Sequence, residues 1–477
     1  MDFSAANTDL WKIITQGGLL CVLLLVGNVL RRKIPILSKS LLPTAVIGGF
    51  VGLLLRQLGW FPLDNTFLES VNYHMIAIGF IALGLRIPRR AKGQRKTAAV
   101  RDGTKTGLFI VSNYLIQGVL GLVIMIVLAA TVMPGLFRAA GLLLPMGFGQ
   151  GPGQANNIGT LYETQYGFTG GTTFGLAIAT MGFLFASIGG IIYLNWMIRH
   201  GKFRMPVASE HHDPSAEPVA DDGEIPLVEA VDKFTIQMSM VLGVYLLTFL
   251  FSWGLVSLFD VFGLEGAKKT IAPLIWGFNF LIGSSMALGM RGIFSGLRKS
   301  GLMTRQYPNN YLLNRISGFA FDLMIVASIC AIDIGDLASL WGPFLLLCIV
   351  GGFVTMWYCQ KVSARLYPGY PVEGMLSMYG MMTGTVSTGI MLLREVDPSF
   401  KTPAANNLVI GSSVAILVAF PILIMVGLAP QSEGLLWLTL GLAAAYAVVI
   451  NILMLRKTGA KARAAAERSN TAEDAKP

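Results

Sequence analysis

Residues 142–170 read LLLPMGFGQGPGQANNIGTLYETQYGFTG, a stretch rich in glycine and in side-chain amides that lies between apolar segments. Lipid offers no hydrogen bonds to backbone N–H and C=O groups. A broken helix at membrane depth is therefore tolerated only where protein buries it or where it lines a wet cavity. We interpret this stretch as a re-entrant hairpin, at about residues 139–165, that carries a binding site.

A second stretch, GMLSMYGMMTGTVSTGIMLLREVDPSF at residues 374–400, repeats the pattern in the other half of the chain. When the two are aligned, Gly151 of the first corresponds to Gly384 of the second. Glycine-interrupted segments at corresponding places in two halves are typical of the binding region of a secondary transporter. We therefore predict a second re-entrant hairpin at about residues 373–398.

The composition indicates a polytopic membrane protein. Of the 477 residues, 54% are apolar and only 13% are charged. The net charge of +10 comes from basic residues in short loops beside apolar segments, which indicates anionic lipid and the positive-inside bias rather than nucleic acid. The four cysteines lack the spacing of a disulfide framework or a metal site, so we interpret them as core thiols.

A transmembrane helix needs about 20 apolar residues, and the chain offers eleven segments of roughly that length. Their approximate positions are residues 10–30, 41–58, 70–86, 106–131, 172–198, 236–259, 271–290, 316–332, 338–359, 403–428 and 434–455. The two hairpins are additional to these spans. The predicted fold is thus an all-α polytopic membrane protein.

The basic loops follow the first, third and fifth of these spans, so the positive-inside rule places the amino terminus outside and the carboxyl terminus in the cytoplasm. An odd number of spans in the first half inverts the second half relative to the first. We therefore predict two inverted repeats of five transmembrane helices, each with a re-entrant hairpin, plus an extra C-terminal helix. The predicted parts are the first repeat at 1–198, an acidic cytoplasmic linker at 199–233, the second repeat at 234–428, the additional helix at 429–455 and a basic cytoplasmic tail at 456–477.

Three stretches resemble the sodium/glutamate symporter family. They are the glycine-rich turn that starts at Gly147, the arm from Leu161 to Thr169, and the segment Leu42–Gly49, which opens a span with a proline. The resemblance extends over roughly residues 10–428. It implies a ten-span core with two re-entrant loops, a homodimer, and sodium-driven uptake of glutamate across the plasma (inner) membrane by movement of a transport domain against a scaffold. The first loop departs from the family's adjacent glycines followed by histidine, and reads GFGQGPGQ at residues 147–154.

An anionic substrate needs hydrogen-bond donors, and the amino terminus of a helix supplies free N–H groups and a positive dipole end. Each hairpin tip offers such a terminus, together with amides or hydroxyls and with glycines that let the backbone approach a ligand. The predicted substrate-binding residues are Gln150, Gly151, Gly153, Gln154, Asn156, Asn157, Thr383, Gly384 and Thr385.

Sodium prefers oxygen ligands, which hydroxyls and freed carbonyls at the second tip can provide. Asp322 is an isolated ionisable residue within a span, and such residues are functional candidates. The alternatives are that it caps its own helix or pairs with Arg315. The predicted ion-binding residues are Ser387, Thr388 and Asp322.

We therefore expect a sodium-coupled symporter of glutamate or a similar acidic amino acid or dicarboxylate that works by elevator-like alternating access. The alternatives are a proton- or sodium-coupled transporter of another carboxylate or amino acid, and a membrane sensor or channel that does not transport actively. An intramembrane aspartyl protease would need a partner for Asp322, and Asp333 with Asp336 reads instead as an external turn. We expect no enzymatic activity, no cofactor, and no metal other than sodium as the coupling ion.

Overall fold

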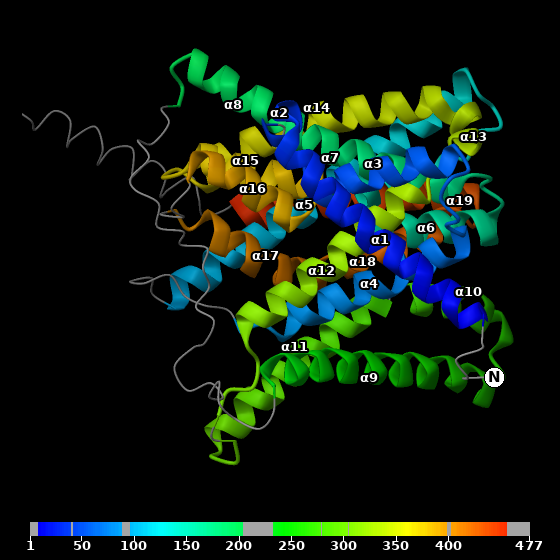
Figure 1. Ribbon diagram of the computed structural model, residues 1–477. Helices are drawn as coiled ribbons and strands as arrows, with labels where there is room; N and C mark the ends of the chain where they lie inside the picture. The colour runs from blue at the N-terminus through cyan, green and yellow to red at the C-terminus, as the bar shows by residue number, and fades with distance from the viewer. Residues whose placement is uncertain are drawn as a thin grey trace, which may run out of the picture. The chain divides into compact units, whose positions relative to one another are not determined.

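The computed structural model describes residues 8–39, 42–87, 96–203, 232–277, 279–303, 305–397 and 402–455, and these residues are almost entirely helical (Figure 1). Most of the predicted linker, residues 204–231, and the predicted tail, residues 456–477, lie outside them. The chain divides into two compact units, which we treat separately. Unit 1 comprises Met1–Pro88, Pro152–Ala177 and Asp213–Leu337, and unit 2 comprises Arg89–Gly151, Ile178–His212 and Ala338–Pro477.

Unit 1 is a bundle in which α4 packs against both α11 and α12, and α3 packs against α1 and α12. Apolar side chains of several of these helices form its core, with Ile81 and Leu85 of α4 against Val241 of α9 and Leu313 of α12. Its helices are α1 (Thr8–Lys33), α2 (Pro35–Lys39), α3 (Thr44–Gln57), α4 (Asn65–Leu85), α6 (Pro152–Tyr166), α9 (Lys233–Val261), α10 (Glu265–Gly277), α11 (Asn279–Lys299), α12 (Asn310–Cys330) and α13 (Ile334–Leu337).

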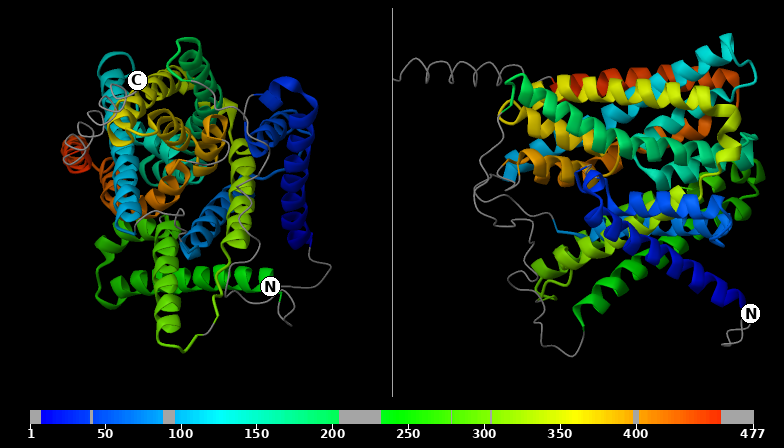
Figure 2. Two further views of the ribbon diagram at one scale, coloured as in Figure 1. Left: turned by 90° about the vertical axis from the view of Figure 1, so that its left-hand side faces the viewer. Right: turned by 45° about the horizontal axis from the view of Figure 1, so that its top comes forward.

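The outer helix of unit 1, α9, packs against α10 and α11, as two further views show (Figure 2). It exposes large apolar side chains along much of its length, among them Leu246, Phe249 and Trp253. A helix that is apolar on its exposed face as well as on its packed face suits a hydrocarbon environment. This is the expected surface of a helix that faces lipid.

Unit 2 is organised around the long helix α5, which packs against α14, α17, α19 and the short 3₁₀-helix η1. The helix α7 (Gly171–Leu184) runs from residues of unit 1 into unit 2. The other elements are α5 (Lys96–Thr131), η1 (Arg138–Leu142), η2 (Pro145–Gly149), η3 (Phe185–Gly189), α8 (Gly190–Arg199), η4 (Ala338–Leu340), α14 (Trp341–Leu366), α15 (Pro371–Met382), α16 (Val386–Val396), α17 (Ala404–Val418), α18 (Phe420–Leu428) and α19 (Glu433–Leu455).

Nine helical stretches in the described residues are long and apolar enough to cross a membrane, and a tenth is present if the bent pair α17 and α18 forms one span. The predicted span at 41–58 corresponds to α3, which has only 14 residues. The predicted span at 271–290 falls on the described residues of α10 and α11, and the candidate span by length and composition is Asn279–Lys299.

Each unit draws helices from both halves of the sequence. Unit 1 holds the first three predicted spans of each half, as α1, α3 and α4 and then as α9, α10 with α11, and α12. Unit 2 holds most of the last two of each half, together with α19. Spans in corresponding positions along the two halves are therefore found in the same unit.

The C-terminal helix α19 is joined to unit 2 by a closed ring of hydrogen bonds. The hydroxyl of Tyr358 on α14 donates to Asn451 Oδ1 at 2.7 Å, and Asn451 Nδ2 donates to Ser112 Oγ of α5 at 2.7 Å. A hydrogen bond between the hydroxyls of Ser112 and Tyr358 closes the ring. The ring satisfies polar groups of three residues in an apolar setting and joins α19 to α5 and α14 within unit 2.

Candidate functional site

The first predicted hairpin tip is a place where the helix is broken. A π-helix, η2, ends at Gly149, and α6 begins at Pro152. Between them Gly151 has a φ of +90°, a conformation that residues with a side chain rarely adopt. Proline suits the first turn of a helix because it has no N–H to leave unpaired. The irregular backbone falls within the stretch predicted as the first hairpin, and its re-entrant course stays a prediction.

Two of the predicted amides on α6 hold this helix in unit 1. Asn156 Oδ1 accepts from Asn72 Nδ2 of α4 at 3.4 Å, and Asn72 Oδ1 in turn accepts from Ser328 Oγ of α12 at 2.7 Å. Asn157 Nδ2 donates to the carbonyl of Gly277 at 3.1 Å. These side chains already have protein partners, which supports a positioning role for them.

Gln154, one turn earlier on α6, is different. Its side chain is completely buried, yet neither its amide nitrogen nor its amide oxygen has a hydrogen-bond partner within the described residues. Beside it, Gly153 lies so close to α4 and α12 that a Cβ would come within 2.6 Å of Ile76 Cδ1 and 2.7 Å of Met324 Sδ. A buried amide without partners is unfavourable by about 1–3 kcal/mol. Among the predicted site residues, Gln154 is therefore the one whose amide atoms are both available to bind a ligand.

At the second tip most of the predicted hydroxyls are used locally. Thr383 Oγ1 donates back to the carbonyl of Tyr379 at 2.8 Å. Thr385 caps α16, since its Oγ1 accepts from the backbone N–H of Thr388 at 3.4 Å and lies 3.2 Å from the Thr388 hydroxyl. The side chain of Ser387 lies outside the described residues. The local bonds of Thr383 and Thr388 show how hydroxyl groups satisfy themselves along their own helix.

Residues of the two predicted tips lie side by side within unit 2. A Cβ on Gly151 would lie 3.7 Å from the carbonyl oxygen of Gly384 and 3.8 Å from Thr385 Cγ2. On α7, a Cβ on Gly182 would lie only 2.4 Å from the carbonyl oxygen of Thr383 and 3.1 Å from Phe148 Cδ1. The glycines thus allow backbone segments far apart in sequence to approach closely, and Gly151, Gly384 and Thr385 are brought together.

The sequence analysis missed one buried residue beside these tips. Gln117, in the middle of α5, is 1% exposed, and its Nε2 donates to Thr355 Oγ1 at 3.0 Å and to the Met382 carbonyl at 2.9 Å. Its Oε1 has no partner among the residues that the structure describes. A polar residue inside a largely apolar span is itself a signal of function, but the sequence analysis did not consider Gln117.

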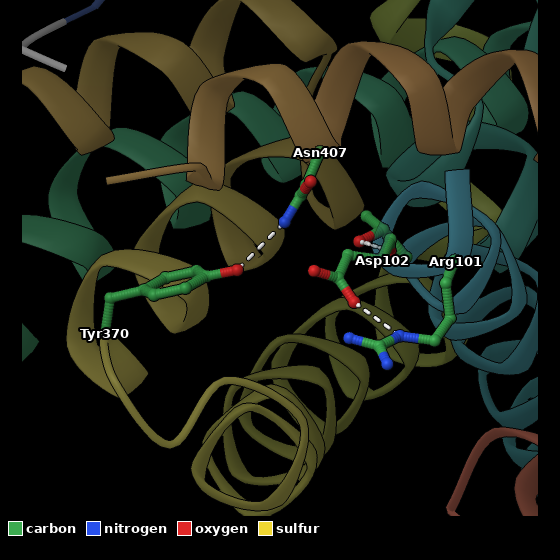
Figure 3. Close-up of polar contacts among 5 residues, drawn as sticks. Arg101, Asp102, Tyr370 and Asn407 are labelled. Atoms are coloured by element: carbon green, nitrogen blue, oxygen red, sulfur yellow. Dashed lines mark hydrogen bonds and ion pairs between the residues drawn. The ribbon is translucent and has the colours of Figure 1, made fainter. Parts of the chain in front are cut away.

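A hydrogen bond at the start of the second hairpin joins it to α17, close to an ion pair within α5 (Figure 3). The Tyr370 hydroxyl accepts from Asn407 Nδ2 at 2.8 Å, and the carboxylate of Asp102 accepts from Arg101 Nε at 3.2 Å (Figure 3). Burial, and to a lesser degree the Asp102 carboxylate, raise the pKa of Tyr370, which therefore stays protonated. The contact places Asn407 beside the second hairpin.

Asp322 lies in unit 1, on α12, whereas Thr388 lies in unit 2. The side chain of Asp322 makes no hydrogen bond or ion pair with any described residue, and it is only partly buried. The alternative pairing with Arg315 is not found, because that guanidinium lies over the Tyr311 ring, 5.0 Å from its centroid. The assignment of Asp322 as an ion ligand stays a prediction.

Nine long apolar helices in the described residues define an integral multi-pass membrane protein. The chain belongs to the sodium/glutamate symporter family, whose model matches residues 12–256, just over half of its length. Membership implies a sodium-coupled transporter rather than an enzyme. No curated protein matches the chain.

Proposed function

We propose that this protein is a sodium-coupled symporter of glutamate or a similar acidic amino acid or dicarboxylate, working by elevator-like alternating access. The observation that carries the proposal is the amide of Gln154, fully buried in the first turn of α6 and without a partner in the described part of the chain. In an apolar setting such an amide is unfavourable unless a solute binds it.

An acidic substrate matches this position chemically. The first turn of α6 presents backbone N–H groups and the positive end of the helix dipole, both of which favour a carboxylate. The Gln154 amide adds a side-chain donor beside them. At the second tip, the carbonyls near Gly384 and the oxygens of Thr385 and Thr388 provide the hard ligands that a sodium ion prefers. Coupling follows if the protein that carries both solutes, or neither, moves more readily than the protein with sodium alone.

We also infer that the two halves are inverted repeats, that both hairpins are re-entrant, and that the protein is a homodimer with an external amino terminus. The presence of corresponding spans of the two halves within the same unit supports the repeat. The broken helix around Gly151 and the short helices α15 and α16 support the hairpins.

The direct test is uptake of labelled L-glutamate into proteoliposomes with an inward sodium gradient, an inward proton gradient or neither. We expect accumulation only with sodium, and its loss when the gradient is dissipated. Gln154→Met, which keeps the length of the side chain but removes the amide, should abolish uptake. Gln237→Met is the matched control, because Gln237 is buried but has partners for both amide atoms, Tyr307 and Asn309.

The possible outcomes separate the alternatives. Accumulation driven by the proton gradient would replace sodium with protons as the coupling ion. Downhill flux without accumulation under any gradient would identify a channel. If glutamate neither binds nor moves, the substrate assignment is wrong, and the GFGQGPGQ segment at residues 147–154 becomes the place to search for a different solute.

A further inference from the structure

The orientation of the Gln117 amide is fixed by its surroundings. A carbonyl oxygen can only accept a hydrogen bond, so the atom that faces the Met382 carbonyl at 2.9 Å must be the amide nitrogen. The same nitrogen donates its second hydrogen to Thr355 Oγ1 at 3.0 Å. Oε1 is consequently held on the other side, as a buried acceptor without a partner among the described residues.

A glycine of the first tip covers this acceptor. A Cβ on Gly149 would lie 3.0 Å from Gln117 Oε1 and 2.5 Å from Tyr114 Cδ1, so a residue with a side chain does not fit there unless its neighbours move. Gly149 is the last residue of the π-helical turn η2, and the next residue, Gln150, has a buried Nε2 without a partner in the described chain. A fixed acceptor and an unpaired donor thus flank a single glycine.

We propose that Gln117 Oε1 binds the positively charged centre among the transported solutes, either the ammonium group of an amino acid substrate or the coupling sodium ion. An amide oxygen accepts hydrogen bonds and coordinates cations, and it repels a carboxylate. The bare backbone of Gly149 lets a solute reach the oxygen once the η2 turn shifts. This inference rests on the proposed function, and it adds to that function the group that distinguishes an amino acid from a plain dicarboxylate.

The experiment compares the binding of L-glutamate with that of glutarate, which has the same two carboxylates and no ammonium group, to purified wild type and to Gln117→Met over a range of sodium concentrations. If the oxygen binds the ammonium group, the variant loses about 10- to 100-fold in affinity for glutamate and none for glutarate, since a hydrogen bond to a charged group is at stake. If it binds sodium, both affinities fall alike, and the sodium concentration needed for half-saturation rises by a similar factor.

Asn113→Leu is the matched control for damage to the helix. Asn113 lies one turn before Gln117 on α5, and its buried amide is satisfied by the Phe109 carbonyl at 3.0 Å and the Cys359 thiol at 3.5 Å. This variant should lower stability without changing the preference between the two ligands or the sodium requirement.

Affinities and sodium dependence within twofold of wild type in Gln117→Met would overturn the proposal, as would losses that Asn113→Leu reproduces. If wild type binds neither glutamate nor glutarate, the proposed substrate is wrong and sodium alone decides the role of Gln117. In that case a sodium-induced rise in melting temperature that is unchanged in Gln117→Met overturns the subsite.

Discussion

Replacing Gln154 by methionine should make the substrate-free protein more stable while it abolishes binding. The amide is completely buried with both polar atoms unpartnered in the described chain. Removing an unsatisfied buried polar group recovers about 1–3 kcal/mol in the free energy of unfolding. Methionine has a similar length and no strong hydrogen-bonding atoms, so it fills the same space without this penalty.

Substrate should reverse the order of stability. At a concentration of about 100 times the dissociation constant, a ligand that binds only the folded state stabilises it by about 2.7 kcal/mol. Wild type should gain this stabilisation from glutamate with sodium, and Gln154→Met should gain none. The assay is thermal unfolding of the purified proteins with and without both solutes.

The control Gln237→Met should lower the free energy of unfolding of the substrate-free protein, the opposite of the change expected for Gln154→Met. It leaves the Tyr307 carbonyl and the Asn309 N–H without the bonds that Gln237 makes to them, at 2.8 Å and 3.0 Å. We expect a loss of about 1–3 kcal/mol. If Gln154→Met also lost more than about 1 kcal/mol in the absence of substrate, the reasoning would be refuted, because its amide would then have a stabilising partner.

Three further predictions concern other parts of the chain. Gly182→Ala places a methyl group 2.4 Å from the Thr383 carbonyl oxygen. If this overpacking destabilises the binding conformation by about 1–3 kcal/mol, the affinity for substrate drops about 5- to 150-fold. Gly243→Ala is the control: its methyl group enters open space, so this variant should bind substrate normally. Asn451→Leu should lower the free energy of unfolding by about 1–3 kcal/mol, seen as a lower melting temperature, because it opens the ring of hydrogen bonds to α19. Burial, and to a lesser degree the charge of Asp397, raise the pKa of the Glu373 carboxyl above 4.5. The folded protein therefore keeps this proton to a higher pH than the unfolded chain, and it loses stability as the pH rises from the unfolded pKa to the folded pKa. Glu373→Gln should therefore melt above wild type at pH 8, with the difference closing toward pH 4.5; a difference that stays constant with pH would contradict the assignment.

Hydropathy located nearly all of the helices, because burial in lipid or in a membrane bundle demands apolar residues over a known length. The amide-rich first tip was also predictable, since polar side chains in an apolar segment need a reason to be there.

The sequence could not show which of those polar groups are already satisfied. Asn156 and Gln154 are chemically alike and two residues apart, yet one is bonded to α4 and the other has no described partner. The amide of Gln117 is oriented by Thr355, which is 238 positions away in sequence. Contacts of this kind depend on tertiary packing, which no local periodicity encodes.

The ring formed by Ser112, Tyr358 and Asn451 also has a consequence for biosynthesis. Two of its three members enter the membrane before the helix that carries the third, and in lipid there is little water to bond them while they wait. Unit 2 can therefore complete this ring only after α19 has been inserted, later than the helices that carry Ser112 and Tyr358. A product truncated before α19 would present unsatisfied polar groups inside the bilayer, which makes it a natural target for membrane quality control.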